Sequence, residues 1–238
     1  AVVVLGGAVA LATSACGGPM QAGAAAVVQG QRTSDRDVQS RSAAFVSLLV
    51  KNGAAQESDI SDGTRAAVAK AQVSQLVRTA VWQRAADDLG LAVGADADAK
   101  VRGELVGKAR TELGKNFHGS DDEAVALADA QTQNASALAP SGVPAFIHYQ
   151  ALYQAVINGE AAKLHVSPDL TAQTGPQLQQ GVVAALDKAA KEIDVKISPR
   201  YGDYDPDTRQ VVAADTSWIH PTKDQIANAM AQMQQPPQ

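Results

Sequence analysis

Few side chains in this sequence could do chemistry, and those that could are widely separated. The only cysteine is Cys16, so the chain can form neither an intrachain disulfide nor a thiolate metal cage. None of the four histidines has a second histidine or a carboxylate at metal-ligand spacing within one helix. We therefore predict no metal site and no cofactor. The histidines are His118, His148, His165 and His220.

Two acidic runs could be mistaken for cation sites. Residues 121–123 (DDE) stand where a helix is predicted to begin, and acidic side chains at that position cap the helix and favour its positively polarised first turn. Asp203, Asp205 and Asp207 alternate in a predicted loop, but the glycine and the distal glutamate of a calcium loop are missing. No glycine loop of phosphate-binding type and no nucleophile elbow is present. We predict no catalytic residue and no enzyme activity.

The residues around Cys16 predict a specific function for this cysteine. Residues 1–15 open with AVVVLGGAVAL, an apolar run shorter than the roughly 20 residues that span a bilayer and typical of a signal peptide. Residues 11–18 (LATSACGG) resemble the lipobox of bacterial lipoproteins, with Thr13 where that family usually has leucine. The resemblance implies cleavage before Cys16 and lipidation of Cys16, with 16–24 as a flexible tether. The alternative is a buried cysteine that ends an apolar strand.

Composition favours packed helices and disfavours nucleic acid as a partner. Apolar residues make up 45% of the chain but aromatic residues only 4%, and much of the apolar share is alanine, the best helix former. The net charge is −5 and the first 31 residues carry no charge, so there is no basic stripe for a phosphate backbone.

Apolar spacing and capping residues predict one mainly α domain over residues 25–200. The longest helical pattern follows a cap at Ser61 or Asp62 and ends at Gly90. The part from 201 to 238 is rich in turn residues and then in glutamine, and we expect it to be irregular and partly disordered. Helices are expected at about 35–51, 64–89, 96–113, 121–134, 143–158 and 177–190, and strands at about 24–28 and 193–197. Residues 29–33 either complete a short hairpin with 24–28 or form a turn after it.

Three segments resemble the SurA amino-terminal domain family of extracytoplasmic chaperones, in the reduced lipoprotein form of high-GC Gram-positive bacteria. Residues 25–38 (AAVVQGQRTSDRDV) are similar to the family's opening strand, glycine turn and first helix. Residues 68–101 look like its long helix, Leu-Gly turn and second helix, and residues 195–204 (VKISPRYGDY) are like its closing strand. The resemblance covers most of the chain between 24 and 204.

The resemblance implies a fold and a function. The fold is a helical core closed by pairing the first and last strands, with an apolar groove that holds unfolded segments of exported proteins. Many relatives carry an inserted parvulin domain, but too few residues separate the helices on either side of residues 159–175 for such an insert. The lipid anchor implied by Cys16 would place the protein on the extracytoplasmic face of the bacterial cell membrane.

Three functional hypotheses follow. The first is a tethered chaperone that binds unfolded or extended polypeptides through apolar contacts, and its candidate groove residues are Trp82, Phe146, Tyr149 and Tyr153. For each of these side chains taken singly, core packing is the favoured role. The second is a prolyl isomerase with an unrecognised site, and the third is a structural envelope lipoprotein that binds one folded partner. The sequence leaves the oligomeric state open.

Overall fold

The computed structural model describes residues 22–132 and 136–215; Cys16, the leader before it and the segment from 216 onward lie outside the described residues. This part of the chain is mainly helical, with a few short antiparallel strands in two small sheets, which confirms the predicted fold class. None of its helices is long and apolar enough to cross a membrane. In chain order the elements are β1 (Ala24–Val28), β2 (Gln31–Ser34), α1 (Asp35–Lys51), η1 (Glu57–Asp59), α2 (Asp62–Asp88), α3 (Ala95–Leu113), α4 (Asp121–Ala130), η2 (Pro140–Gly142), α5 (Val143–Leu164), α6 (Gly175–Glu192), β3 (Val195–Ile197), β4 (Asp203–Asp205) and β5 (Gln210–Val212).

Strand β1 lies in the middle of the larger sheet and joins the two ends of the domain. The strand order is β2-β1-β3, and both pairs are antiparallel. The turn between β1 and β2 consists of Gln29 and Gly30, which both have positive φ (50° and 76°), as a tight type I′ hairpin requires. On its other side β1 pairs with β3, where Ala26 faces Ile197. The predicted pairing of amino-terminal and carboxy-terminal segments is therefore confirmed.

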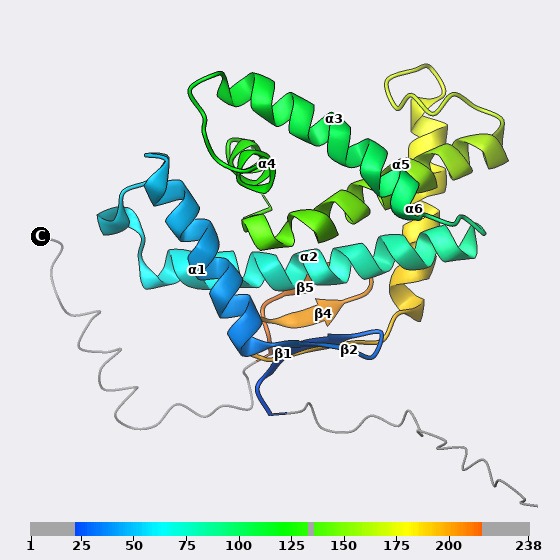
Figure 1. Cartoon of the computed structure of the whole chain (residues 1–238). Helices are drawn as coiled ribbons and strands as arrows, with labels where there is room; N and C mark the ends of the chain where they lie inside the picture. The colour runs from blue at the N-terminus through cyan, green and yellow to red at the C-terminus, as the bar shows by residue number, and fades with distance from the viewer. Residues whose placement is uncertain (1–21, 133–135, 216–238) are drawn as a thin grey trace, which may run out of the picture.

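Helix α2 runs through the middle of the molecule, between the sheets on one side and α3, α4 and α5 on the other (Figure 1). Ser61 caps its start by accepting a hydrogen bond from the Thr64 amide (3.1 Å). Its buried stripe, which includes Val73, Val77 and Ala85, packs in the largest core cluster together with side chains of α5, α6 and the sheet. Burial of a valine contributes about 1.5–3 kcal/mol, so the buried valines of α2 stabilise the fold.

Helices α3 and α4 form a second layer that packs on α5. Its core includes Val101, Val125 and Phe146. Helix α4 begins with a capping box, in which the Ser120 hydroxyl accepts from the Glu123 amide and the Glu123 carboxylate accepts from the Ser120 amide. The acidic run at 121–123 therefore serves helix initiation, as its position predicted.

Helix α5 is longer than the sequence predicts. The predicted end at residue 158, before Gly159, is wrong, because α5 continues to Leu164 and ends at His165, which has a left-handed φ of 55°. A Cβ atom at Gly159 would lie 2.7 Å from Leu91 Cδ1. The glycine thus allows α5 to pack closely against the turn after α2 and does not stop the helix. Helix α4, by contrast, ends at Ala130, short of the predicted 134.

The expectation of an irregular segment from residue 201 onward is wrong for its first part. Strands β4 and β5 form an antiparallel hairpin with Asp203 opposite Val212. The Tyr204 hydroxyl donates to the Ala190 carbonyl of α6 (3.1 Å), and β5 packs against α2. These contacts join the hairpin to distant elements, which explains why turn-rich local sequence did not reveal it.

Candidate functional site

The four aromatic residues singled out in the sequence form one cluster between α2 and α5. Phe146, Tyr149 and Tyr153 are spaced three and four residues apart, so they share a face of α5, and this face meets Trp82 of α2. The Tyr153 ring centroid lies 4.9 Å from that of Trp82, and Tyr149 meets Trp82 edge-on at 6.2 Å. Phe146 lies 6.2 Å from Tyr149. Aromatic pairs at these distances contribute about 0.5–1.5 kcal/mol beyond area burial.

The members of this cluster differ in exposure. Trp82 and Phe146 are 8% and 7% exposed, so most of their surface is used in core packing. Tyr149 and Tyr153 are partly exposed. Tyr149 lines two neighbouring cavities, and Tyr153 lines neither of them. Tyr149 is therefore the predicted residue with the best access to a bound molecule.

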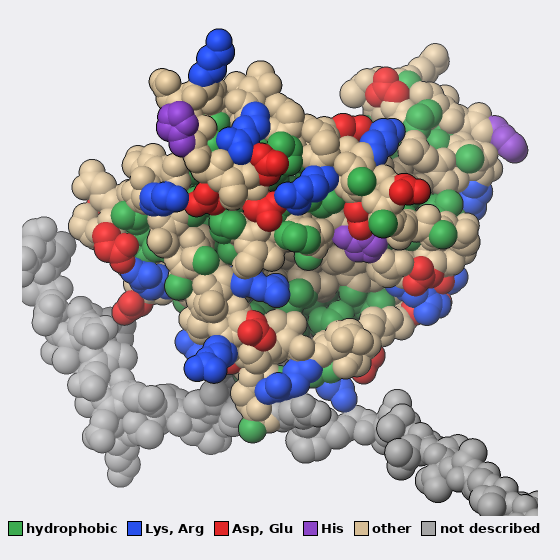
Figure 2. Space-filling model, in the orientation of Figure 1, with side chains coloured by type: hydrophobic (Ala, Val, Ile, Leu, Met, Phe, Trp, Pro, Cys, Tyr) green, Lys and Arg blue, Asp and Glu red, His purple; other side chains and the backbone are tan. Residues whose placement is uncertain are grey.

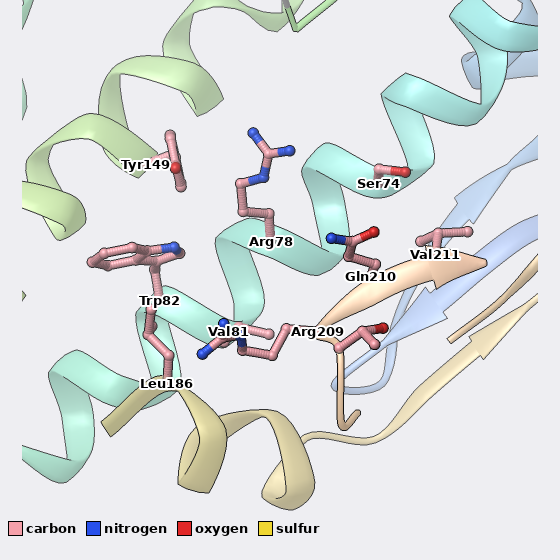
Figure 3. Close-up of a pocket in the computed structure, with 10 residues that line it drawn as sticks. Ser74, Arg78, Val81, Trp82, Tyr149, Leu186, Arg209, Gln210 and Val211 are labelled. Carbon is pink, nitrogen blue, oxygen red and sulfur yellow. The ribbon is translucent and has the colours of Figure 1, made fainter. Parts of the chain in front are cut away.

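The first cavity lies between α2, α6 and the turn that joins β4 to β5, and has a volume of about 470 Å³. Figure 3 shows Trp82 and Tyr149 on one side of it and the residues of the β4–β5 turn on the other. Its lining combines apolar, aromatic and hydrogen-bonding side chains with two arginines, and contains no acidic residue. The lining residues are Ser74, Arg78, Val81, Trp82, Tyr149, Leu186, Thr208, Arg209, Gln210 and Val211.

The second cavity, of about 480 Å³, adjoins the first and is bounded by α3, α4 and α5. Both cavities share Arg78 and Tyr149. Asp129 lines the second cavity and accepts a hydrogen bond from the Ser136 amide (2.8 Å). Burial raises the pKa of the Asp129 carboxyl above its ordinary value. Phe146 and Leu105 supply apolar surface there.

Arg78 stands at the junction of the two cavities, and it is not among the residues predicted from the sequence. Its guanidinium carbon lies 6.0 Å from the centroid of the Tyr149 ring, within the range of a cation–π contact. Burial raises the pKa of the Tyr149 hydroxyl, so this group stays a hydrogen-bond donor well above neutral pH. No carboxylate of the described part of the chain forms an ion pair with Arg78. Its position one turn before Trp82 is a signal that could have pointed to it.

Arg209 is the second functional residue that sequence reasoning missed. It lies in the β4–β5 turn with a φ of 60°, a left-handed conformation that costs a non-glycine residue roughly 1–2 kcal/mol. Its Nη1 donates to Asp187 Oδ1 of α6 (2.8 Å), which joins the hairpin to that helix. An arginine where a hairpin turn favours glycine is the local signal that could have found it.

A separate groove of about 420 Å³ runs along the opposite face of α2. Its floor carries Leu76 and Ala80, and its walls come from the β1–β2 hairpin on one side and η2 with the start of α5 on the other. Gln75 lines this groove, and its Nε2 is buried without a hydrogen-bond partner. Figure 2 shows hydrophobic side chains between charged residues across the hollow middle of the face in view.

His148 and Asp205 have structural partners, and His220 lies outside the described residues. His148 Nδ1 lies 3.1 Å from Asp98 Oδ1 and His148 Nε2 lies 3.1 Å from Gln83 Oε1, so this ring connects α5 with α3 and α2. Asp205 accepts hydrogen bonds from the Asp207 amide and the Thr208 hydroxyl and thereby shapes its turn. Within residues 22–132 and 136–215 no group of three or more histidine, cysteine, aspartate or glutamate side chains could hold a metal ion.

The site is thus two connected cavities that share an aromatic ring and the Arg78 guanidinium, which forms no ion pair within residues 22–132 and 136–215, beside a groove on the far side of α2. Such a surface can bind apolar and anionic groups together. The relation to the SurA amino-terminal domain family stays a prediction. No family model, no curated protein and no solved structure matches this chain.

Proposed function

We propose that the protein is a lipid-anchored, extracytoplasmic, chaperone-like protein that binds unfolded or extended segments of exported polypeptides. The observation that supports binding is the pair of adjoining cavities, of about 470 and 480 Å³, that share Arg78 and Tyr149. Together they offer aromatic, aliphatic and hydrogen-bonding side chains from the β4–β5 turn to α3 and α4. A surface of this mixed kind can hold the side chains of an extended chain by reversible contact.

The groove on the other side of α2 supports the same proposal. Its floor is apolar, and the exposed side-chain amide of Gln31 lies among its lining residues. An amide side chain both donates and accepts hydrogen bonds, as the main chain of an extended polypeptide does. Binding of this kind needs neither nucleotide nor metal.

Aggregation of a client protein tests the proposal. The protein should suppress light scattering by a chemically unfolded client, and Tyr149→Ser should weaken this effect because it removes the ring shared by both cavities. Tyr149→Phe keeps the ring and should retain the effect. Leu170→Ser is the matched control, since Leu170 is a large apolar residue, 41% exposed, that lines neither cavity. If wild-type protein leaves aggregation unchanged, the proposed binding function is wrong.

Cross-linking in cells separates this function from that of a lipoprotein with one folded partner. A photoreactive residue in place of Gln210, which is exposed and lines the first cavity, would report what enters it. A broad set of adducts supports many clients. One dominant adduct contradicts the chaperone proposal and favours a dedicated partner.

The location is tested by chemistry at Cys16. In a bacterial host that processes lipoproteins, we expect a mature chain that starts at Cys16 and carries a lipid-sized mass increment. Cys16→Ser should abolish both the increment and the partitioning of the protein into membranes. An unmodified wild-type chain would contradict the lipid anchor and leave the binding proposal to stand by itself.

A further inference from the structure

The first cavity combines positive charge with an apolar interior. Arg78 and Arg209 are its charged lining residues, and neither aspartate nor glutamate lines it. Trp82, Val81 and Leu186 supply the apolar part. In Figure 3 the Arg78 side chain extends from α2 beside Tyr149. The cavity is thus complementary to a group that is both apolar and negatively charged.

The two arginines are not equally available to a ligand. Arg209 is held by Asp187 at 2.8 Å and also lies 3.4 Å from the Val183 carbonyl. Arg78 contacts the face of Tyr149 and is attracted by the Asp129 carboxylate, which lines the second cavity with it, but it forms no ion pair within the described residues. A guanidinium has five N–H donors in a planar fork that fits a carboxylate. Arg78 is therefore the group that would receive an incoming carboxylate.

We infer that this cavity selects polypeptide segments in which an acidic side chain lies two residues from an aromatic or aliphatic one. The inference rests on the proposed function, because it names the class of segment bound at the same site. The carboxylate binds Arg78, and the apolar side chain packs on Trp82 and Tyr149.

The spacing of two residues between the acidic and the apolar side chain of the segment follows from the geometry of the site. The guanidinium of Arg78 lies 6.0 Å from the Tyr149 ring centroid, and this ring lies 6.2 Å from that of Trp82. In an extended chain the residues i and i+2 point to the same side and are about 6.6 Å apart. One residue of the segment can therefore reach Arg78 while the second residue along reaches the rings.

Capped peptides test this selectivity without interference from terminal charges. We would titrate the full-length protein with three fluorescent peptides that are identical apart from Glu, Gln or Lys placed two residues before a Leu. Wild-type protein should bind the Glu peptide about fivefold more tightly than the Gln peptide, which corresponds to a partly exposed charge pair of about 1 kcal/mol. The Lys peptide should bind more weakly than both.

Variants assign the preference to Arg78. Arg78→Gln should bring the Glu and Gln peptides to equal affinity, and Arg78→Glu should reverse the order in favour of Lys. Arg36→Gln is the matched control, because Arg36 is an exposed arginine on α1 that lines neither cavity. Its preference should equal that of the wild type.

The outcomes separate the inference from the proposed function. Equal binding of all three peptides by the wild type overturns the charge selectivity and leaves polypeptide binding standing. A Glu preference that survives in Arg78→Gln overturns the role of Arg78. Failure of every peptide to bind overturns the inference and the proposed function together.

Discussion

The buried carboxylate of Glu160 offers the sharpest test of how the structure is stabilised. Glu160 is 0% exposed and lies in the interior between α5 and α6. One of its oxygens accepts from Lys163 Nζ at 3.0 Å, and the other, Oε2, has no hydrogen-bond partner among residues 22–132 and 136–215. Oε2 faces Gly181, where a Cβ atom would lie only 3.1 Å away. We predict that Glu160→Met stabilises the protein, because methionine has similar length and no polar atom to desolvate.

The expected size of the effect follows from this environment. A buried acceptor without a partner costs about 1–3 kcal/mol, and replacing a buried ion pair by apolar side chains is often neutral or stabilising. The pair with Lys163 offsets part of the cost, although Lys163 itself is 62% exposed and its attraction is screened by water. We expect a gain of about 1–2 kcal/mol, which for a domain of this size raises Tm by roughly 2–8 °C.

Thermal and urea unfolding, monitored by circular dichroism, measure the change in stability. Lys163→Met should destabilise the protein, because it leaves the buried carboxylate unpaired, and it should have little further effect once Glu160 is Met. Glu112→Met is the control, since Glu112 forms a similar helical pair with Lys108 at 3.8 Å but is 46% exposed, and its effect should stay within about 0.5 kcal/mol. A Glu160→Met protein less stable than wild type would refute the reasoning and show that the carboxylate is net stabilising.

Three further predictions concern titration and glycine. Burial raises the pKa of the Asp129 carboxyl, so the stability that this carboxyl contributes is present below its ordinary pKa of about 3.9 and is lost as the pH rises through its higher pKa in the folded protein. Asp129→Asn should therefore stabilise the protein at neutral pH. In acid unfolding experiments this gain in stability should disappear. Burial raises the pKa of Tyr204 to about 12, so the stability that its neutral hydroxyl contributes is present below the ordinary pKa of about 10 and is lost as the pH rises through about 12. Tyrosinate absorbance should include a component near pH 12, and Tyr204→Phe should lack this component. Gly175→Ala places a Cβ atom 2.1 Å from the Leu170 carbonyl oxygen and should lower the free energy of urea unfolding by about 1–3 kcal/mol. Gly107→Ala, with open space around it in α3, should raise this free energy by up to about 1 kcal/mol. Equal effects of the two substitutions would contradict the packing around α6.

Most of the fold could be predicted because residues at the start of several helices are recognisable N-caps in the local sequence. Ser34, Ser61 and Ser120 each accept a hydrogen bond from an amide three residues later, and each precedes apolar residues at helical spacing. The errors occur where a distant contact decides the structure. The sequence predicts that the helix ends before Gly159, but Gly159 packs against Leu91, which comes from a different part of the chain.

The candidate site could be predicted only in part from the sequence, because distant contacts also decide its structure. Helical spacing within α5 brought together Phe146, Tyr149 and Tyr153, and all three lie in the aromatic cluster. Arg78 and Arg209 lie far apart in sequence, on α2 and on a hairpin that local propensity did not reveal. Their shared cavity exists only after that hairpin has docked on α6 through Asp187 and Ala190.

The pairing of β1 with β3 also sets the order of events when the chain is made. Contacts such as the one between the Asp194 amide and Gln29 join residues 165 positions apart. A ribosome that releases the amino terminus first must therefore deliver nearly the whole domain before β1 gains its second neighbour. Until then the only partner of β1 within the sheet is β2, and the core beneath it is open. A stop after α6 would yield a chain that has the α-helices of the described residues but lacks Ile197, Tyr201 and Val211 of the largest core cluster, and we expect proteases to recognise such a chain as unfinished.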